Sequence, residues 1–339
     1  MRAAVLTAPE RIEIRDVETP APGPGELLVK LKACGICTLE QRLFTGEMKM
    51  PYPVVPGHEA SGVVTATGPG VLAGYEPGTR VALDLVLRCG ACHYCRTGRS
   101  NMCQNRFNAG QRVLGGFGEY LVVRQSQAFP IAAGLSFEEA AFAEPVACCI
   151  RSLKRVGLRL AEDLLVIGAG PMGQMHVQVA SRMGARVFVS DPDAARAAMA
   201  LKMGAVAAVA PGALAALVKE RTDGRGVDAC VVTSPAPAAL EAAFASISKT
   251  GRVNVYTAYP GKMALPVDAN VLHRSEYAVT GTEGRTERDF YQAVRLLSFG
   301  MVDVKPLISR TVGLDGIEAG IRAALTRDTY RVLLAHEGA

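Results

Sequence analysis

The sequence predicts a two-domain α/β protein in which an irregular β-barrel is joined to a doubly wound parallel sheet. Three observations support this fold class. The chain has 339 residues, more than a single hydrophobic core usually supports. As far as about residue 145, short apolar strands are separated by glycine and proline. Beyond Leu164, apolar strands alternate with alanine-rich helical stretches, which is typical of a parallel sheet with crossover helices.

The individual elements can be placed in chain order from their hydrophobic periodicity. Strands of the barrel are expected at residues 11–18, 26–33, 60–68 and 79–83. Strands of the parallel sheet are expected at residues 164–168, 186–191, 227–233 and 252–257, with helices near Met172–Met183 and Ala194–Met203. The last segment should form helices at 290–300 and 316–325, and strands at 304–309 and 331–335.

Composition and charge exclude several classes of protein. A net charge of +5 is mild for this length and no Lys/Arg block is present, so nucleic acid is not an expected partner. No segment is apolar for long enough to be a signal peptide or a membrane span. We therefore expect a cytoplasmic protein without a membrane partner. In a reducing compartment, its nine cysteines indicate metal ligation or a reactive thiol rather than disulfides.

Four of these cysteines, Cys89, Cys92, Cys95 and Cys103, have the spacing C-x2-C-x2-C-x7-C. Four thiolates at such short intervals can complete the tetrahedron that a structural Zn²⁺ prefers. Free surface thiols would be a coincidence at this spacing, and a redox CxxC pair would leave two cysteines unused. The segment is therefore predicted to be a zinc lobe that the metal holds together.

A second set of metal-binding side chains is dispersed over three fragments. A catalytic zinc takes three mixed Cys, His and carboxylate ligands and keeps one position open. A single histidine can equally be a hydrogen-bonded packing residue, so the set alone is weak evidence. The three fragments carry Cys34 and Cys37, then His58 and Glu59, then Glu144, Cys148 and Cys149.

The segment VIGAGPMG contains Gly168, Gly170 and Gly173, and follows an apolar strand directly. Glycines at this spacing permit a tight turn, the approach of a pyrophosphate to the backbone and close helix packing. The following helix, which includes Pro171 and Met172, would direct its N-terminal N–H groups at the phosphates. The motif therefore predicts a dinucleotide-binding turn, whereas a glycine-rich turn without a ligand is the alternative.

Asp191 follows the last of these glycines by eighteen residues, at the end of the next strand. Its carboxylate would accept hydrogen bonds from the ribose hydroxyls of the adenosine and would repel a 2′-phosphate. NAD is therefore the expected cofactor. The nearby Arg196 leaves NADP open as an alternative.

The motifs CGIC, GHEASG, the four-cysteine segment, Glu144-Pro145 and VIGAGPMG occur here in a specific order. In this order they resemble the zinc-dependent medium-chain alcohol/polyol dehydrogenase family, over essentially the whole chain. The resemblance implies a GroES-like catalytic domain formed by residues 1–148 and 286–339, with the structural zinc lobe near 89–103. It implies a Rossmann NAD-binding domain at 149–285, inserted between these two segments.

The resemblance also implies the roles of individual residues. The catalytic zinc ligands would be Cys37, His58 and either Glu59 or Glu144. By the same resemblance, Glu40 would accept a hydrogen bond from the ligand histidine, and Arg331 would contact the pyrophosphate of the cofactor. The residues expected to bind the cofactor are Gly168, Gly170, Pro171, Met172, Gly173, Asp191 and Arg196.

Two positions depart from the pattern of the family. Many members relay the alcohol proton through Ser or Thr and then His, but this chain has Leu39 and Arg42 there. We therefore expect Glu59, Glu144 or Thr38 to pass the proton through ordered water. Three cysteines have no assigned role and are expected to be buried, inert thiols: Cys34, Cys148 and Cys149.

The expected reaction is reversible hydride transfer between a secondary alcohol and NAD, with two zinc ions per chain, one catalytic and one structural. Polar residues near the predicted metal indicate a polyol, sugar, cyclitol or amino-sugar ring as the substrate. A threonine-type amino-alcohol dehydrogenase is the alternative within the enzyme class. A zinc-free quinone-type reductase and a non-enzymatic zinc and nucleotide-binding protein are alternatives of other classes. The strand at 252–260 is expected at a sheet edge that pairs subunits in a homodimer or homotetramer.

Overall fold

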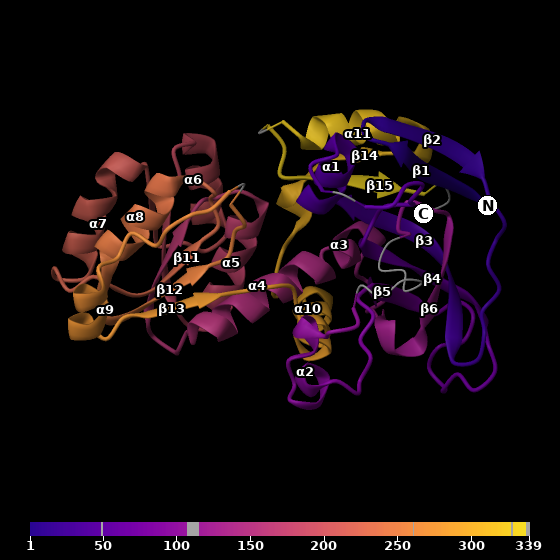
Figure 1. The fold of residues 1–339 in the computed structure, drawn as a ribbon, viewed down its shortest axis with the longest axis horizontal. Coiled ribbons are helices and arrows are strands. Elements are labelled where there is room, and N and C mark those ends of the chain that lie inside the picture. Colours follow the sequence, from indigo (N-terminus) through magenta and orange to yellow (C-terminus); the bar gives the residue numbers. More distant parts are fainter. Residues whose placement is uncertain (49, 107–114, 260, 327, 337–339) are drawn as a thin grey trace. The chain divides into compact units, whose positions relative to one another are not determined.

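The structure is a computed structural model that describes residues 1–48, 50–106, 115–259, 261–326 and 328–336. The chain forms two compact units (Figure 1): unit 1 is Met1–Pro145 with Thr286–Ala339, and unit 2 is Val146–Arg285. Both ends of the chain therefore belong to unit 1, with unit 2 inserted between them. The first boundary lies within helix α4 (Ala143–Val156), three residues before the boundary expected from the sequence.

Unit 1 is built on a mainly antiparallel sheet in the order β14, β15, β3, β4, β5 and β7, with β6 also paired to β3 and a separate hairpin, β1–β2. Its strands are β1 (Arg2–Ala8), β2 (Arg11–Asp16), β3 (Glu26–Ile36), β4 (Glu59–Thr67), β5 (Arg80–Asp84), β6 (Tyr120–Arg124), β7 (Ala128–Pro130), β14 (Ile308–Val312) and β15 (Arg331–Ala335). Its helices are α1 (Thr38–Thr45), α2 (His93–Arg96), α3 (Phe137–Ala141), α10 (Glu287–Ser298) and α11 (Ile317–Ala324).

Strand β3 is the central strand of this sheet and leads directly to the predicted metal ligands. Its first half alternates between buried and half-buried residues, as expected for a strand with one solvated face. From Leu31 to Ile36 every residue is buried, because β4, β15 and helices α1, α3 and α11 pack around this end. The carboxyl end of β3 thus places Cys37 at the edge of the core of unit 1.

Unit 2 is a parallel sheet in the order β10, β9, β8, β11, β12 and β13. The chain proceeds outwards from β8 to β10 and then returns to β11, so the order of strands reverses between β8 and β11. Crevices at such reversals are where dinucleotides bind. The strands are β8 (Asp163–Ile167), β9 (Arg186–Ser190), β10 (Ala207–Val209), β11 (Val227–Val232), β12 (Ile247–Val255) and β13 (Ala278–Gly281), and the helices, besides α4, are α5 (Pro171–Arg182), α6 (Ala194–Lys202), α7 (Leu214–Arg221), α8 (Pro237–Ser246) and α9 (Ala269–Ser275).

Two expectations about strands were wrong. Residues 304–309 do not form one strand, because a 3₁₀ turn occupies Lys305–Leu307 and only then does β14 begin. Pro306 explains the difference, since its ring fixes φ and it has no N–H to donate to a ladder. The strand that contains residues 252–255 is not an edge strand either, because β12 pairs with β11 on one side and β13 on the other. Pro260, at the end of that expected segment, lies outside the described residues.

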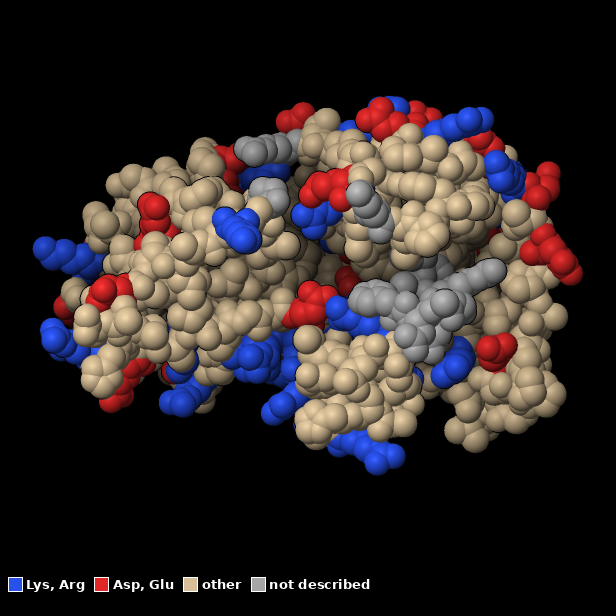
Figure 2. Space-filling view, in the orientation of Figure 1, with Lys and Arg blue, Asp and Glu red and all other residues tan. Residues whose placement is uncertain are grey.

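The described helices include none that is both long enough and apolar enough to cross a bilayer. On the face drawn in Figure 2, Lys and Arg side chains are interspersed with Asp and Glu over the surface of each unit.

Candidate active site

Cys37 lies between the last residue of β3 and the first residue of α1, where it is the N-cap of the helix. Its thiol is partly exposed and lies 3.6 Å from the Thr38 hydroxyl. Desolvation opposes ionisation of this thiol, but the Arg331 guanidinium and His58 together lower the pKa of Cys37 to about 6. A thiolate, the form that binds metals, is therefore favoured here.

Glu40 joins the segments that carry Cys37 and His58. Its side chain is buried, and its carboxylate accepts hydrogen bonds from the Cys37 N–H (2.9 Å), the Gly57 N–H (3.3 Å) and His58 Nδ1 (2.7 Å). Because the carboxylate accepts this hydrogen bond, Nδ1 of His58 carries a proton and Nε2 is turned towards Glu144. Glu40 therefore orients both residues, as the resemblance implied for the histidine.

His58 and Glu144 approach each other on the side opposite Glu40. The distance from His58 Nε2 to Glu144 Oε1 is 3.9 Å, and Glu144 is buried. Desolvation disfavours protonation of His58, yet the pKa of this ring lies well above its ordinary value because Glu40 is so close. Binding of a metal at Nε2 would displace the second proton of the ring.

Glu59 reaches the same place from the neighbouring strand, because β3 and β4 pair with Gly35 opposite Glu59. A Cβ atom on Gly35 would lie 2.0 Å from Glu59 Oε2, so the missing side chain provides the space for this carboxylate. Arg331 Nη2 lies 3.1 Å from Glu59 Oε1. Burial raises the pKa of Glu59 well above its usual range, although the charge of Arg331 opposes this.

The donor atoms of Cys37, His58 and Glu59 all lie within 4.8 Å of one another. One thiolate, one imidazole and one carboxylate suit Zn²⁺ better than Mg²⁺ or Ca²⁺, which prefer oxygen ligands throughout. The structure thus brings together the predicted ligands, with Glu144 next to His58. Arg331 is also part of this cluster, where it donates to the Ile36 carbonyl (3.3 Å) and pairs with Glu59.

The two residues at the relay positions have other roles. Leu39 packs against the hydrophobic core of unit 1, and Arg42 forms an ion pair with Glu47 (2.9 Å). The exposed Thr38 hydroxyl, in contrast, is next to the Cys37 thiol.

Among the three cysteines without an assigned role, Cys34 and Cys149 are buried as expected, but Cys148 is partly exposed, so burial was wrongly predicted for it. It lies one turn after Glu144 on α4, and its side chain projects from the same face of that helix.

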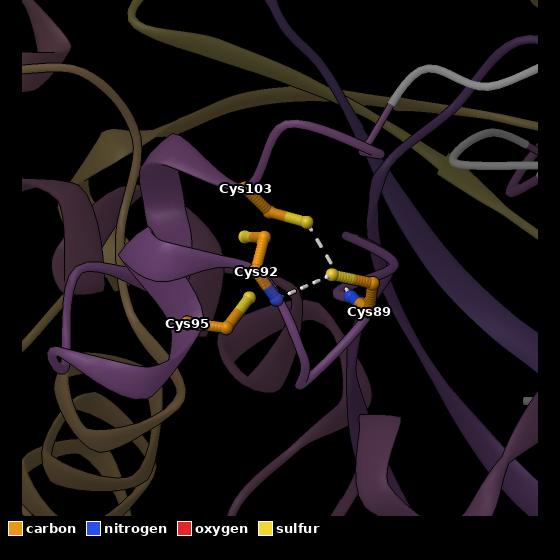
Figure 3. Close-up of side chains that lie close together, drawn as sticks. All are labelled: Cys89, Cys92, Cys95 and Cys103. Carbon is orange, nitrogen blue, oxygen red and sulfur yellow. Dashed lines mark hydrogen bonds between the residues drawn. The ribbon is translucent and has the colours of Figure 1, made fainter.

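The second cluster of unit 1 consists of Cys89, Cys92, Cys95 and Cys103, whose sulfur atoms face one another around a common centre (Figure 3). The Cys92 N–H donates to Cys89 Sγ (3.3 Å), and the Cys89 N–H donates to Cys103 Sγ (3.4 Å). The backbone N–H groups of Cys92 and Ala91 lower the pKa of the Cys89 thiol to about 6. Four sulfurs within 4.8 Å of one another fit a closed tetrahedral zinc site.

This cysteine lobe is attached to the rest of unit 1 by polar contacts. The Ser100 hydroxyl donates to Glu287 at the start of α10. Arg88, just before the lobe, pairs with Asp84 at the end of β5 (2.7 Å) and lies 3.4 Å from Glu287. Three of the four cysteines are only partly buried, so little apolar surface is available to stabilise the lobe.

In unit 2, the glycine motif forms the turn from β8 into α5, as its sequence predicts. Gly168 has a φ of 102°, and a Cβ on Gly173 would lie 1.9 Å from the Gly168 carbonyl oxygen. These two glycines are therefore required by the fold itself. Gly170 differs, because its backbone is extended and its nearest neighbour is Arg196 Nη1, 3.7 Å from where its Cβ would lie. The open space above Gly170 fits the close approach of a pyrophosphate, while Pro171 and Met172 begin the helix.

Asp191 and Arg196 lie beside this turn. The Asp191 carboxylate accepts hydrogen bonds from the N–H groups of Ala169 (2.6 Å) and Asp193 (2.8 Å), just after β9 ends. Arg196 is in the first turn of α6 and lies 3.8 Å from the Asp193 carboxylate. An anionic group and a cationic group thus flank the glycine turn, as the sequence indicated.

Sequence reasoning missed two residues that shape these sites. Gly35 was quoted only as part of CGIC, although its pairing with Glu59 could be inferred once β3 and β4 were aligned as neighbours. Gln174, directly after the last glycine of the motif, was not considered. Its signal was a polar residue in the first turn of the helix that follows the glycine motif.

The fold and the two sets of metal-binding side chains are typical of a zinc-dependent dehydrogenase, and similarity to known proteins supports this class. Residues 23–133 match the Alcohol dehydrogenase GroES-like domain, and residues 171–298 match the Zinc-binding dehydrogenase family. An L-threonine 3-dehydrogenase from Pyrococcus furiosus is 31% identical over 98% of this chain and 98% of its own. A sorbitol dehydrogenase from Bacillus subtilis is 32% identical over 96% of this chain and 94% of its own.

A solved structure from Sinorhizobium meliloti, bound to NADP, has a TM-score of 0.90 and 30% identity over 98% of both chains. The chain therefore belongs to the zinc-dependent medium-chain alcohol dehydrogenase family, whose relatives here are oxidoreductases that act on CH–OH groups. The predicted fold class, a GroES-like domain with a Rossmann domain, is confirmed. Membership of this family indicates a nicotinamide cofactor. It does not decide between NAD and NADP.

Proposed function

We propose that this protein oxidises a secondary alcohol on a polyol, sugar, cyclitol or amino-sugar ring, with NAD as the hydride acceptor. The observation that carries the proposal is the converging donor set of Cys37, His58 and Glu59, with Glu144 3.9 Å from the imidazole. The net change is loss of a hydride and a proton from the CH–OH group, which leaves a ketone, NADH and H⁺. When bound, zinc supplies a Lewis acid and the dinucleotide supplies the hydride acceptor.

The residues of the chain have separable roles in this proposal. Cys37 and His58 bind zinc, and Glu59 is the third ligand because its oxygen lies within 4.8 Å of their donor atoms. Glu40 holds His58 in the tautomer that presents Nε2. Glu144 accepts the proton that leaves the substrate and passes it on through water. Thr38, whose exposed hydroxyl is next to Cys37, is the alternative exit for that proton.

The two glutamates can be separated by substitution. Glu59→Gln is expected to lower the zinc content from two ions per chain to one, because an amide is a poorer zinc ligand than a carboxylate. Glu144→Gln is expected to keep both ions and to lower kcat, since proton transfer by a positioned group is commonly worth about 10²–10⁴-fold. If Glu144→Gln lost zinc and Glu59→Gln kept both ions, Glu144 would be the third zinc ligand and Glu59 the proton acceptor.

The preference for NAD rests on Asp191. Its carboxylate is fixed beside the glycine turn by the Ala169 and Asp193 N–H groups, where its charge opposes a 2′-phosphate. Arg196 acts in the opposite direction. We expect tighter binding of NADH than of NADPH, which equilibrium titration of nucleotide fluorescence measures directly.

The decisive experiment is a substrate panel with purified, zinc-loaded protein. Reduction of NAD should be fastest with polyols, cyclitols or aminated sugar rings, and slow with simple aliphatic alcohols. Metal analysis should find two zinc ions per chain. Turnover without zinc at the Cys37 site would contradict the proposal, as would a complete absence of dinucleotide binding.

A second candidate is a threonine-type amino-alcohol dehydrogenase. It is favoured by the L-threonine 3-dehydrogenase of Pyrococcus furiosus, which matches this chain over 98% of its length. Including L-threonine and other β-hydroxy amino acids in the panel separates the two candidates. A kcat/KM for L-threonine well above that for every ring substrate would favour this second function.

A further inference from the structure

Gln174 is a polar residue in the interior of unit 2. It belongs to the first turn of α5, directly after Gly173, and its side chain is fully buried. The next residues along this helix include apolar side chains that are also buried, among them Met175, Val177 and Val179. A glutamine in such a position is unfavourable unless its polar atoms are bonded, so its bonds indicate why it is there.

The Gln174 amide group bridges the glycine turn and the first turn of α6. Its Nε2 atom donates to the Ala169 carbonyl (2.9 Å) and to the Arg196 carbonyl (2.9 Å). The N–H of the same Ala169 is bound to Asp191 (2.6 Å). Both polar groups of Ala169 are therefore fixed, one by Asp191 and one by Gln174. Within the described residues, Gln174 Oε1 is buried without a hydrogen-bond partner, so both bonds of the side chain are made by its amide N–H groups.

The same bridge fixes the backbone of Arg196. Its guanidinium extends back to the glycine turn, where Nη1 lies 3.7 Å from the position of a Cβ on Gly170. The side chain keeps about a fifth of its surface exposed, and its Nε atom lies 3.8 Å from the Asp193 carboxylate. Gln174 thus holds the main chain of Arg196, whose charged head lies beside the glycine turn.

We propose that Gln174 is a positioning residue of the dinucleotide site, which holds Arg196 over the glycine turn and thereby sets how the protein discriminates between a 2′-hydroxyl and a 2′-phosphate. The inference rests on the proposed function, because it assumes that the turn binds a nicotinamide dinucleotide. Asp191 disfavours the 2′-phosphate and Arg196 attracts it, so selectivity depends on where these two charges are held. Gln174 bonds the backbone of Arg196 and the carbonyl of Ala169, whose N–H is bound to the Asp191 carboxylate.

The test is equilibrium binding of NADH and of NADPH to the full-length, zinc-loaded protein, followed by nucleotide fluorescence. Gln174→Met keeps the length and volume of the side chain and removes its donors. We expect the Kd for NADPH to rise about tenfold and that for NADH about two- to threefold, because the doubly charged 2′-phosphate depends most on Arg196. Gln178→Met is the matched control, since it removes another buried glutamine one helical turn further from the glycine turn.

A double-mutant cycle distinguishes positioning from a general loss of stability. In an Arg196→Ala background, Gln174→Met should change either Kd by less than about twofold, because the charge that Gln174 positions is gone. Additive effects of the two substitutions would overturn the proposal. So would an unchanged ratio of the two Kd values in Gln174→Met. If Gln174→Met does not fold, Gln174→Glu, which keeps the shape and offers at most one donor, should shift the ratio in the same direction.

The outcome also separates this inference from the proposed function. If the wild-type protein binds neither nucleotide, the proposed function fails. If it binds them and Gln174→Met leaves both affinities unchanged, the function stands and the role of Gln174 is refuted.

Discussion

The two clusters of metal-binding side chains in unit 1 are assembled in opposite ways. In the cysteine lobe, the donors follow one another between Cys89 and Cys103, and backbone N–H groups bond to the sulfurs. In the Cys37 cluster, the donors come from β3, β4 and neighbouring segments, and the buried side chains of Glu40 and Arg331 hold them. We therefore expect the lobe to depend on a metal for its own structure, and the Cys37 cluster to be arranged by the fold before a metal binds. Loss of a ligand should cost stability in the lobe and turnover in the Cys37 cluster.

The strongest test of this contrast is Cys37→Ser. Because a serine hydroxyl is a poor zinc ligand at neutral pH, kcat/KM should fall by at least about 1000-fold. The zinc content should fall from two ions per chain to one, with little change in Tm. Kinetics, metal analysis and thermal unfolding provide the three measurements. If Cys37→Ser unfolded the protein while keeping its activity per folded molecule, the contrast would be wrong.

A somewhat smaller effect is expected from Gly35→Ala. The new Cβ would lie 2.0 Å from Glu59 Oε2, so the carboxylate must leave its place next to Cys37 and His58. Turnover should fall about 100-fold, together with zinc affinity at this site. Gly134→Ala is the control, because nothing lies within 4 Å of a Cβ added there. Wild-type zinc content and kcat in Gly35→Ala would remove Glu59 from the ligand set.

Glu40→Gln should have a milder effect. The amide oxygen can still accept a hydrogen bond, but the negative charge that holds His58 Nδ1 at 2.7 Å is lost. Substitution of such a supporting carboxylate typically costs about 10–100-fold in metal affinity or activity, and we expect the lower end. Titration of the metal-free protein with zinc measures the affinity. An unchanged affinity would show that the fold alone orients His58.

The smallest effect on turnover is expected from Cys95→Ser in the lobe. Activity per folded molecule should stay within about threefold of the wild type, because the lobe supplies no ligand to the Cys37 cluster. The Tm should fall by about 5 °C or more, since a structural zinc contributes directly to folding. Differential scanning calorimetry is the measurement. A loss of activity as large as that of Cys37→Ser, without a change in Tm, would make the lobe part of the catalytic site.

The contrast between the clusters also explains what could be predicted. The four cysteines of the lobe and the three glycines of the turn are close in sequence, so local spacing is sufficient to locate them. The family resemblance supplied Cys37, His58 and the two glutamates, but spacing alone could not rank Glu59 against Glu144. Their ranking depends on the pairing of β3 with β4, which sets Gly35 opposite Glu59.

The misplaced elements have similar causes. The apolar pattern at 304–309 is as compatible with a strand as with a turn, and the turn prevails at Pro306 because this residue has no N–H. The strand at 252–255 has the apolar composition of an edge that seeks a partner, but the short β13 covers that edge within the same chain. Cys148 was expected to be buried, and its position on α4 leaves it partly exposed instead.

By itself, the sequence determined the two types of architecture, the zinc lobe and the dinucleotide turn, because each depends on residues that are neighbours along the chain. Only the tertiary structure decided which carboxylate meets Cys37 and His58, and that Gln174 ties Arg196 to the glycine turn. The physical reason is that these contacts join segments far apart in sequence, and strand register and helix packing set their distances.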